Sequence, residues 1–205
     1  MSAIAPTRLY TASQSRAVDA AAIDNFELPG PVLMARAARA AFALLMEKLP
    51  GVTCVQVLCG PGNNGGDGLL LALLAQGRGL PVRVLLVDGE PRSADALAAA
   101  ERVRSAGLTL EAFAADALAN EGVVVDAMLG TGISGPPRDA YALAIEAVNA
   151  LNVPVLALDV PSGVNADTGA VASTAIRARW TQSFITAKRG LYTAVGAECA
   201  GEHFC

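Results

Sequence analysis

The sequence contains very few of the residues from which histidine-dependent sites are built. Its 205 residues include a single histidine, His203, near the end of the chain. Metal sites with several histidine ligands are therefore excluded, and a histidine-based nucleophile triad has little support. Aromatic residues are also scarce, at 4% of the chain, whereas alanine and the other aliphatic residues dominate. This composition suits helices packed closely against a sheet.

Disulfide bonds are not indicated by the cysteine pattern. The chain has four cysteines, and no two of them form a C-x-x-C pair. Cys54 and Cys59 lie five residues apart on one predicted strand, so they point to opposite faces and cannot bridge within it. A disulfide framework is not expected, and a reducing cytoplasm fits this cysteine usage best.

Runs of basic charge and long apolar runs are also missing. The formal net charge is −4 at pH 7, with no basic cluster, so a nucleic-acid partner is not indicated. No apolar stretch approaches the roughly 20 residues that a membrane span needs. The opening MSAIAPTRLY lacks the charged start and apolar core of a signal peptide. We expect no membrane partner and a cytoplasmic location.

What is present is a regular alternation of apolar runs and helical stretches. Two helices are expected first, from Thr11 to about Glu27 after a capping box, and from Val32 to Lys48. Strands are expected at 53–59, 82–87, 108–113, 123–126, 153–158 and 181–186, and helices at 69–76, 93–105 and 139–151. Valine- and leucine-rich strands separated by helices predict a parallel sheet covered on both faces.

We therefore predict an α/β fold, a three-layer αβα sandwich with a Rossmann-like, mostly parallel sheet and extra N-terminal helices. Residues 1–205 are expected to form a single domain, because the length suits one core and no long linker is visible.

The glycine-rich segment Gly60–Gly68, GPGNNGGDG, stands between a predicted strand and a predicted helix. Five of its nine residues are glycine. Such a turn presents backbone N–H groups and the positive end of a helix dipole to an anion such as phosphate. The segment matches the dinucleotide fingerprint, and Asp88 follows the next strand, where a ribose-binding acid would lie. The alternative is a tight turn that needs glycine torsions.

Polar residues within this segment argue against an ordinary hydride-transfer site. Asn63 and Asn64 fill the loop with amide groups, and Asp67 places a carboxylate close to where a pyrophosphate would lie. Asp67 either stabilises the start of the helix through its dipole or contacts the ligand directly. The sequence leaves both interpretations open.

Two further loops follow strands at the same predicted edge of the sheet. They are residues 126–136, DAMLGTGISGP, and residues 159–165, DVPSGVN. Ligands of such sheets bind beyond the carboxyl ends of the strands. Gly130–Pro136 could hold a phosphate oxygen or simply connect to the next helix, and Arg138 nearby is either a ligand or a solvated side chain.

Strand-end carboxylates and a serine suggest a second component of the site. Asp126 and Asp159 each adjoin a glycine-rich loop, although such residues often serve only as turn residues. Ser162 has no histidine to activate it and no nucleophile-elbow pattern, so we interpret it as an oxygen ligand or a hydrogen-bond donor. Asn64, Asp126 and Ser162 offer only oxygen atoms, which hard cations prefer, and a single carboxylate among them suits an ion of low charge.

The three segments GPGNNGGDG, VVDAMLGTGISGPPR and LALDVPSGVNADTG, in this order, resemble the NAD(P)H-hydrate epimerase family, the YjeF N-terminal domain. The ending ITAKRGLYTAVGAECAGEH is similar to the closing segment of that family. The family's M-E-[NR]-A-G segment is replaced by Met34–Ala38, MARAA. The chain also stops before the family's last strand normally finishes, so the resemblance allows that it is the N-terminal part of a bifunctional enzyme with a dehydratase domain.

The resemblance implies an isomerase that interconverts the R and S forms of hydrated NADH and NADPH (NADHX and NADPHX) at C6. It implies that Asn64, Asp126 and Ser162 bind a potassium ion and that the protein is a homodimer. The implied substrate-binding residues are Asn63, Asn64, Gly65, Gly66, Asp67, Gly130, Thr131, Gly132, Ile133, Ser134, Gly135, Pro136 and Asp159. We hypothesise that Asp159 is the catalytic residue and shuttles a proton on and off the C6 hydroxyl.

Two other functions stay open at this point. A Rossmann-type oxidoreductase would use NAD as cosubstrate and change the nicotinamide absorbance, which an epimerase alone would not. A non-catalytic dinucleotide- or protein-binding scaffold of the same fold is expected to lose motif residues. Retention of Asn64, Asp126, Asp159 and Ser162 favours the enzyme.

Overall fold

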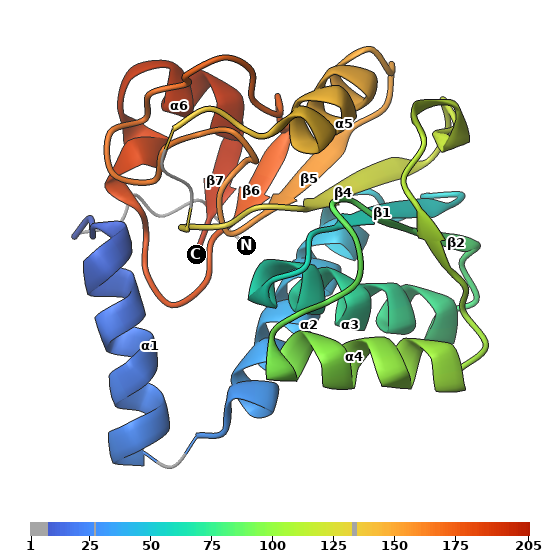
Figure 1. Ribbon diagram of the computed structural model, residues 1–205, viewed down its shortest axis with the longest axis horizontal. Coiled ribbons are helices and arrows are strands. Elements are labelled where there is room, and N and C mark those ends of the chain that lie inside the picture. Colours follow the sequence, from blue (N-terminus) through green and yellow to red (C-terminus); the bar gives the residue numbers. More distant parts are fainter. Residues whose placement is uncertain (1–7, 27, 133–134) are drawn as a thin grey trace.

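Parallel strands form the centre of the structure. The computed structural model describes residues 8–26, 28–132 and 135–205. Within these ranges seven strands form one sheet in the order β3-β2-β1-β4-β5-β6-β7, with every pairing parallel (Figure 1). The strands are β1 (Val55–Cys59), β2 (Val82–Leu86), β3 (Leu110–Ala112), β4 (Val123–Ala127), β5 (Val155–Leu158), β6 (Trp180–Gln182) and β7 (Glu202–Phe204). The predicted α/β class and Rossmann-like sheet are confirmed.

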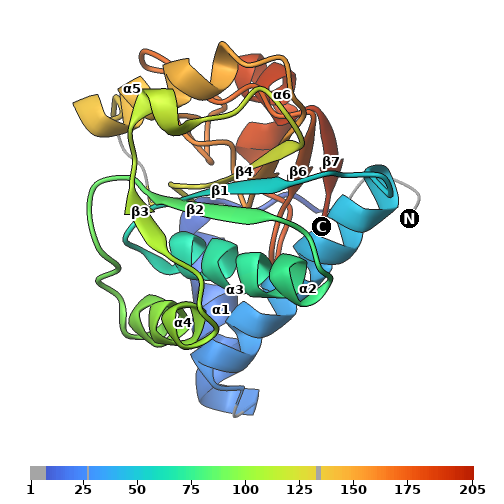
Figure 2. The ribbon, with the colours of Figure 1, turned by 90° about the vertical axis from the view of Figure 1, so that its right-hand side faces the viewer.

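Helices cover both faces of this sheet. In Figure 2, α2, α3 and α4 lie on one side of the strands, and α5 and α6 lie on the other. The described helices are α1 (Ala12–Phe26), α2 (Gly30–Lys48), α3 (Asn63–Gly77), α4 (Ala94–Ser105), α5 (Asp139–Asn149) and α6 (Ala194–Ala200), with short 3₁₀ turns at Ala115–Ala117 and Arg189–Tyr192. The predicted three-layer sandwich is confirmed, and α1 and α2 are the extra N-terminal helices.

The alternation of side chains along β1 divides the core between the two faces. Val55, Val57 and Cys59 pack against α2, α3 and α4, whereas Leu58 joins a cluster around Ile145 of α5 on the opposite face. All of these side chains are buried. Burial on both faces explains why the strands are continuous apolar runs rather than alternating patterns.

Helix α3 begins earlier than the sequence suggests, at Asn63 rather than Leu69. Most of the glycine-rich segment is therefore the first part of a helix and not a loop. A Cβ atom on Gly68 would lie 2.5 Å from the Cβ of Ala127, and one on Gly66 would lie 2.5 Å from the Cε of Met34. These glycines let α3 approach the sheet and α2 closely, although glycine is a poor helix former, which is why the pattern hid the helix start.

The C-terminal part also differs from expectation. The strand expected at 181–186 is the shorter β6, Trp180–Gln182, and the chain then leaves the sheet. The short helix α6 and strand β7 were not predicted, because each has too few residues for a periodic pattern. The expected end of the first helix, Glu27, lies outside the described residues.

The four cysteines are free. No helix in the described ranges is long and apolar enough to cross a membrane. In the segment that departs from the family pattern, Ala38 and Met34 are buried in the core beside α3.

The close packing of α3 on the sheet gives a stability prediction. Gly68→Ala should lower the free energy of unfolding by about 1–3 kcal/mol, because the new methyl group overlaps Ala127 in a filled core. Gly77→Ala is the matched control on the same helix, since a Cβ there meets no atom within 4 Å. The control should leave stability unchanged or slightly higher. Urea denaturation of both variants measures the difference, and equal midpoints would contradict this account of α3.

Candidate active site

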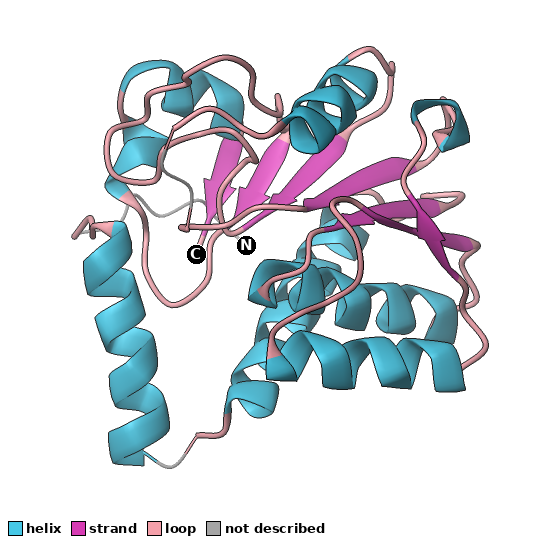
Figure 3. Ribbon diagram, viewed as in Figure 1, coloured by secondary structure: helices cyan, strands magenta, loops and turns pink. Residues whose placement is uncertain are grey.

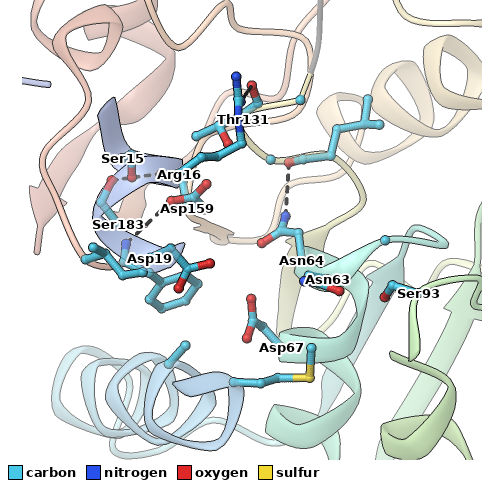
Figure 4. A pocket seen from close by; sticks show the side chains of 18 of the residues that line it. Ser15, Arg16, Asp19, Asn63, Asn64, Asp67, Ser93, Thr131, Asp159 and Ser183 are labelled. Atoms are coloured by element: carbon cyan, nitrogen blue, oxygen red, sulfur yellow. Dashed lines mark hydrogen bonds between the residues drawn. The ribbon is translucent and has the colours of Figure 1, made fainter. Parts of the chain in front are cut away.

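A pocket of about 1140 Å³ opens at the carboxyl edge of the sheet. Its walls come from the segments that follow β1, β4, β5 and β6, and from one side of α1 and α2 (Figure 4). Figure 3 shows the strand ends turning into loops around this region. The predicted convergence of the three sequence motifs on one edge of the sheet is therefore observed.

Beneath the pocket floor, one buried carboxylate ties two of these loops together. Asp126, at the end of β4, accepts hydrogen bonds from the Ser162 backbone N at 2.8 Å and the Ser162 Oγ at 2.6 Å. It also accepts a hydrogen bond from Met128 N at 3.2 Å. Burial raises the pKa of Asp126 to about 6, and the hydrogen bonds from Ser162 and Met128 oppose that shift.

Asn64 joins the third loop to this network. The Leu129 N donates to Ser162 Oγ at 3.0 Å, and Asn64 Nδ2 donates to Leu129 O at 3.0 Å. The remaining amide oxygen, Asn64 Oδ1, is buried and has no hydrogen-bond partner among the described residues. Because buried polar atoms are normally satisfied, this oxygen is a candidate ligand for a cation or for a hydrogen-bond donor.

The structure thus brings together the three oxygen-bearing residues predicted to hold an ion. Asn64 lines the pocket, whereas Asp126 and Ser162 are fully buried behind it. Within the described ranges, no group of three or more histidine, cysteine, aspartate or glutamate side chains is placed to hold a metal ion. A cation here would depend on amide, hydroxyl and single-carboxylate oxygens.

Asp159 follows β5 in a left-handed backbone conformation, with φ of 65°. Two hydrogen bonds hold this backbone: Asp159 N donates to Gln182 O at 2.8 Å, and Ser183 Oγ donates to Asp159 O at 2.8 Å. Aspartate adopts this conformation more readily than most residues. The backbone therefore aims the side chain into the pocket, as Figure 4 shows.

Lys188 is the direct partner of this carboxylate. Its ammonium group donates to Asp159 Oδ1 and, at 2.6 Å, to Phe184 O. The Lys188 side chain is only 1% exposed, so its charge depends on these partners. The other carboxylate oxygen, Oδ2, faces Gly130, where a Cβ would lie 3.3 Å away. Lys188 was present in the closing segment, but its role could not be assigned from sequence.

Asp67 lies on α3 and also lines the pocket. It is the fifth residue of the helix, beyond the first turn, and points into the cavity (Figure 4). This placement favours contact with a ligand over stabilisation of the helix dipole. Burial raises the pKa of Asp67 well above its ordinary value, and the negative charges of Asp159 and Asp19 raise it further, against the opposing effect of Lys188.

Helix α1 contributes side chains that sequence analysis missed. Ser15, Asp19 and Ile23 recur at four-residue spacing, which places them on one face, and all three line the pocket. Arg16 Nη1 donates to Thr131 O at 3.3 Å and so connects α1 with the loop after β4. The spacing was the only available signal, since nothing in the sequence links this helix to a site more than 100 residues later.

Only some of the remaining predicted substrate-binding residues line the pocket. Asn63, Gly130, Thr131, Gly132 and Pro136 line the pocket. Gly65 and Gly66 lie inside α3, where a Cβ on Gly65 would be 1.9 Å from Gly60 O. Gly135 is exposed and does not line the pocket, and Ile133 and Ser134 lie outside the described residues.

Asp88 is engaged by neighbouring side chains at the end of β2. Arg138 donates to Asp88 Oδ2 at 2.6 Å, and Tyr141 donates to the same oxygen at 3.2 Å. Arg138 and Tyr141 line the pocket, whereas Asp88 does not. A ribose hydroxyl would have to compete with these donors for the carboxylate.

The single histidine supports the segment that holds Asp159. His203, on β7, contacts Tyr192 OH through Nδ1 and Ser183 Oγ through Nε2 at 2.9 Å. Since Ser183 donates to Asp159 O, His203 Nε2 donates to Ser183, and in a neutral ring Nδ1 accepts from the Tyr192 hydroxyl. Burial and the Lys188 charge lower the pKa of His203 to about 4, against the opposing effect of Asp159.

Fold and pocket define the class of the protein: an α/β domain of Rossmann type whose site lies at the carboxyl edge of a parallel sheet. Residues 30–190 match the family model described as YjeF-related protein N-terminus. The chain belongs to this family.

Relatives in this family cover nearly the whole chain. The NAD(P)H-hydrate epimerase of Rhodopirellula baltica is 38% identical and covers 94% of this chain and 80% of its own length. The NAD(P)H-hydrate epimerase of Limosilactobacillus fermentum is 37% identical and covers 93% of this chain and 92% of its own length. The bifunctional NAD(P)H-hydrate repair enzyme Nnr of Coxiella burnetii is 42% identical over 96% of this chain, which spans only 40% of that enzyme.

A solved structure agrees on the fold. The crystal structure of yeast ynu0, YNL200c, has a TM-score of 0.82 and covers 90% of this chain and 83% of its own. Its sequence identity is 20%, so the likeness concerns the fold alone.

The neutral state of His203 can be measured directly, because the chain has one histidine. We expect its ring resonances to titrate with a pKa of about 4, below the ordinary value of 6.5. The lowered pKa contributes stability that is complete above pH 6.5 and is lost as the pH falls towards 4. An NMR titration of the folded protein tests this, and a pKa between 6 and 7 would contradict the half-buried, hydrogen-bonded arrangement.

Proposed function

We propose that this chain is an isomerase that interconverts the R and S hydrates of NADH and NADPH at C6. The observation that carries the proposal is Asp159, held by buried Lys188 at the end of β5 and aimed into a pocket formed by all three sequence motifs. The names of relatives that match the chain almost end to end support this reaction.

The chemistry needs a proton carrier and no redox partner. The hydrate carries a hydroxyl on the carbon beside the ring nitrogen. Such a carbon inverts when the oxygen leaves and returns, or when the ring opens and closes again. Either route moves a proton on and off that oxygen, a task that a positioned carboxylate accelerates by roughly 10²–10⁴-fold.

Asp159 is suited to this task through one of its two oxygens. Lys188 occupies Oδ1, so Oδ2, which faces Gly130, is the atom that exchanges the proton. The absence of a side chain at Gly130 leaves room for a ligand beside Oδ2. The start of α3 and the Gly130–Gly132 segment line the pocket, and their backbone N–H groups would bind the dinucleotide phosphates.

A potassium ion fits the oxygen set beside this pocket. The buried Asn64 Oδ1 has no protein partner among the described residues, and Asp126 and Ser162 lie in the same hydrogen-bonded network. Asp126 Oδ2 accepts a single hydrogen bond, from the Ser162 backbone N, and so retains a lone pair for an ion. Asn64, Asp126 and Ser162 would hold the ion, which when bound supplies positive charge near the substrate's phosphates.

We further propose a cellular location, an oligomeric state and a partner enzyme for this chain. The free cysteines suit the reducing cytoplasm, and we propose a homodimer there. Relatives named bifunctional repair enzymes in Coxiella burnetii and Leishmania major support cooperation with an NAD(P)H-hydrate dehydratase, fused or separate.

Asp159→Asn tests the proton carrier. Asparagine tolerates the same left-handed backbone, so we expect the fold to persist, with lower stability because Lys188 loses its carboxylate partner, while turnover falls by about 10²–10⁴-fold. The assay lets an S-specific dehydratase with ATP consume the S hydrate of NADH, then measures recovery of absorbance from the remaining R hydrate after this protein is added.

Asp88→Asn is the matched control for that variant. Asp88 has a similar φ of 68° but does not line the pocket. We expect the control to keep most of its turnover, and thermal unfolding should show that both variants are folded. Near-normal turnover of a folded Asp159→Asn protein would remove Asp159 from the reaction.

Asn64→Ala tests the ion site, because it deletes the unpartnered buried oxygen. We expect activation by potassium chloride, measured against choline chloride at equal ionic strength, to weaken by at least about tenfold in apparent affinity, a loss of roughly 1.4 kcal/mol. Asn64→Asp keeps an oxygen at this position and should retain the response to potassium. Equal potassium activation of wild type and Asn64→Ala would exclude Asn64 from the site.

A further inference from the structure

A second carboxyl group in the pocket has no role in the mechanism described above. Asp67 stands on α3, and Figure 4 shows its carboxyl group directed into the cavity that Asp159 enters from the other side. Asp67 as a whole residue is only 9% exposed. Among the described residues, none donates a hydrogen bond to this carboxyl group or forms an ion pair with it.

The two carboxyl groups therefore have opposite environments. Asp159 is paired with Lys188, whereas Asp67 is buried without a cation of its own and is exposed to the charges of Asp159 and Asp19. Burying an unpaired negative charge costs free energy, and a carboxyl group avoids that cost by keeping its proton. Two acids whose surroundings favour different protonation states are the usual arrangement for an acid and base pair.

The other charged groups at the pocket do not neutralise Asp67. Arg16 on α1 is bound to Thr131 O, and Arg138 is bound to Asp88. Asp95, at the start of α4, also lines the pocket and adds negative charge, and Arg36 lines it from α2. Neither of these two has an ion pair or hydrogen bond to Asp67 in the described structure.

We propose that Asp67 is a second catalytic carboxyl group, which protonates the departing C6 hydroxyl on the face of the ring opposite Asp159. This inference rests on the proposed epimerase function and specifies its route. Inversion exposes both faces of one carbon in turn. Groups on opposite walls of the pocket can serve both faces without the ring turning over in the site.

Asp67 gives its proton to the C6 hydroxyl, the C6–O bond breaks with its electron pair on oxygen, and water leaves. The lone pair of N1 forms a C6=N1 iminium bond. Water then adds to the other face of C6 while Asp159 Oδ2 takes its proton, and the N1 lone pair is restored. In the reverse direction Asp159 donates and Asp67 accepts, and exchange with solvent returns the resting protonation states.

Asp67→Asn tests this assignment, because the amide keeps the shape and cannot give up a proton to the hydroxyl. We expect turnover in the coupled assay to fall by at least about 100-fold. The free energy of unfolding should change little, since the amide has the same shape and places no charge in the buried position. Asp88→Asn, outside the pocket, is the matched control and should keep most of its turnover.

Oxygen labelling gives an independent readout that a merely structural role would not affect. Wild-type protein is incubated with the R hydrate in ¹⁸O water, and the S hydrate formed is examined by mass spectrometry after subtraction of the uncatalysed reaction. The proposed route predicts one ¹⁸O atom for each inversion. Retention of the original oxygen, as in ring opening followed by fast reclosure, would overturn the proposal.

The outcomes separate this inference from the function on which it rests. No acceleration by the folded wild-type protein contradicts the epimerase function itself. Wild-type activity with near-normal turnover in Asp67→Asn, or with retained oxygen, contradicts only the role of Asp67. Loss of turnover in the variant, with labelled product from wild type, supports the two-carboxyl route.

Discussion

The buried carboxylate of Asp126 is the interaction on which the geometry of the site depends. It accepts hydrogen bonds from both the backbone and the hydroxyl of Ser162, and so fixes the end of β4 against the loop that follows β5. Ser162 in turn accepts a hydrogen bond from Leu129, and Leu129 accepts one from Asn64 at the start of α3. Three segments from adjacent strands are thus held in one arrangement by a few hydrogen bonds, and those made by Asp126 are fully buried.

In the pocket above this network, the acidic side chains differ in whether a cation pairs with them. Lys188 and Asp159 form a buried ion pair that orients one carboxylate oxygen and leaves the other facing the cavity. Asp67 approaches from α3 without a cation, so burial favours its protonated form. Asp19 adds negative charge from α1, and burial together with Asp159 raises its own pKa. The resulting contrast between a paired and an unpaired acid gives the pocket its chemical asymmetry.

The sequence predicted most of the sheet and the edge where the site lies, because apolar runs and strand-end motifs are local features. It misplaced the start of α3, since five glycines conceal a helix whose stability comes from packing against the sheet. It could not place Lys188 beside Asp159 or bring Asp19 into the pocket. Those contacts join segments far apart in the chain, and they exist only once the sheet and α1 have assembled.

The central claim is that the protein accelerates inversion at C6, and it can be tested without a coupling enzyme. Purified R hydrate of NADH is incubated with the wild-type protein and potassium, and the ratio of R to S is followed by chromatography beside a protein-free sample. The account predicts rapid approach to the same equilibrium ratio, with no change in nicotinamide absorbance. An approach no faster than in the protein-free sample, with the protein shown to be folded, would contradict it.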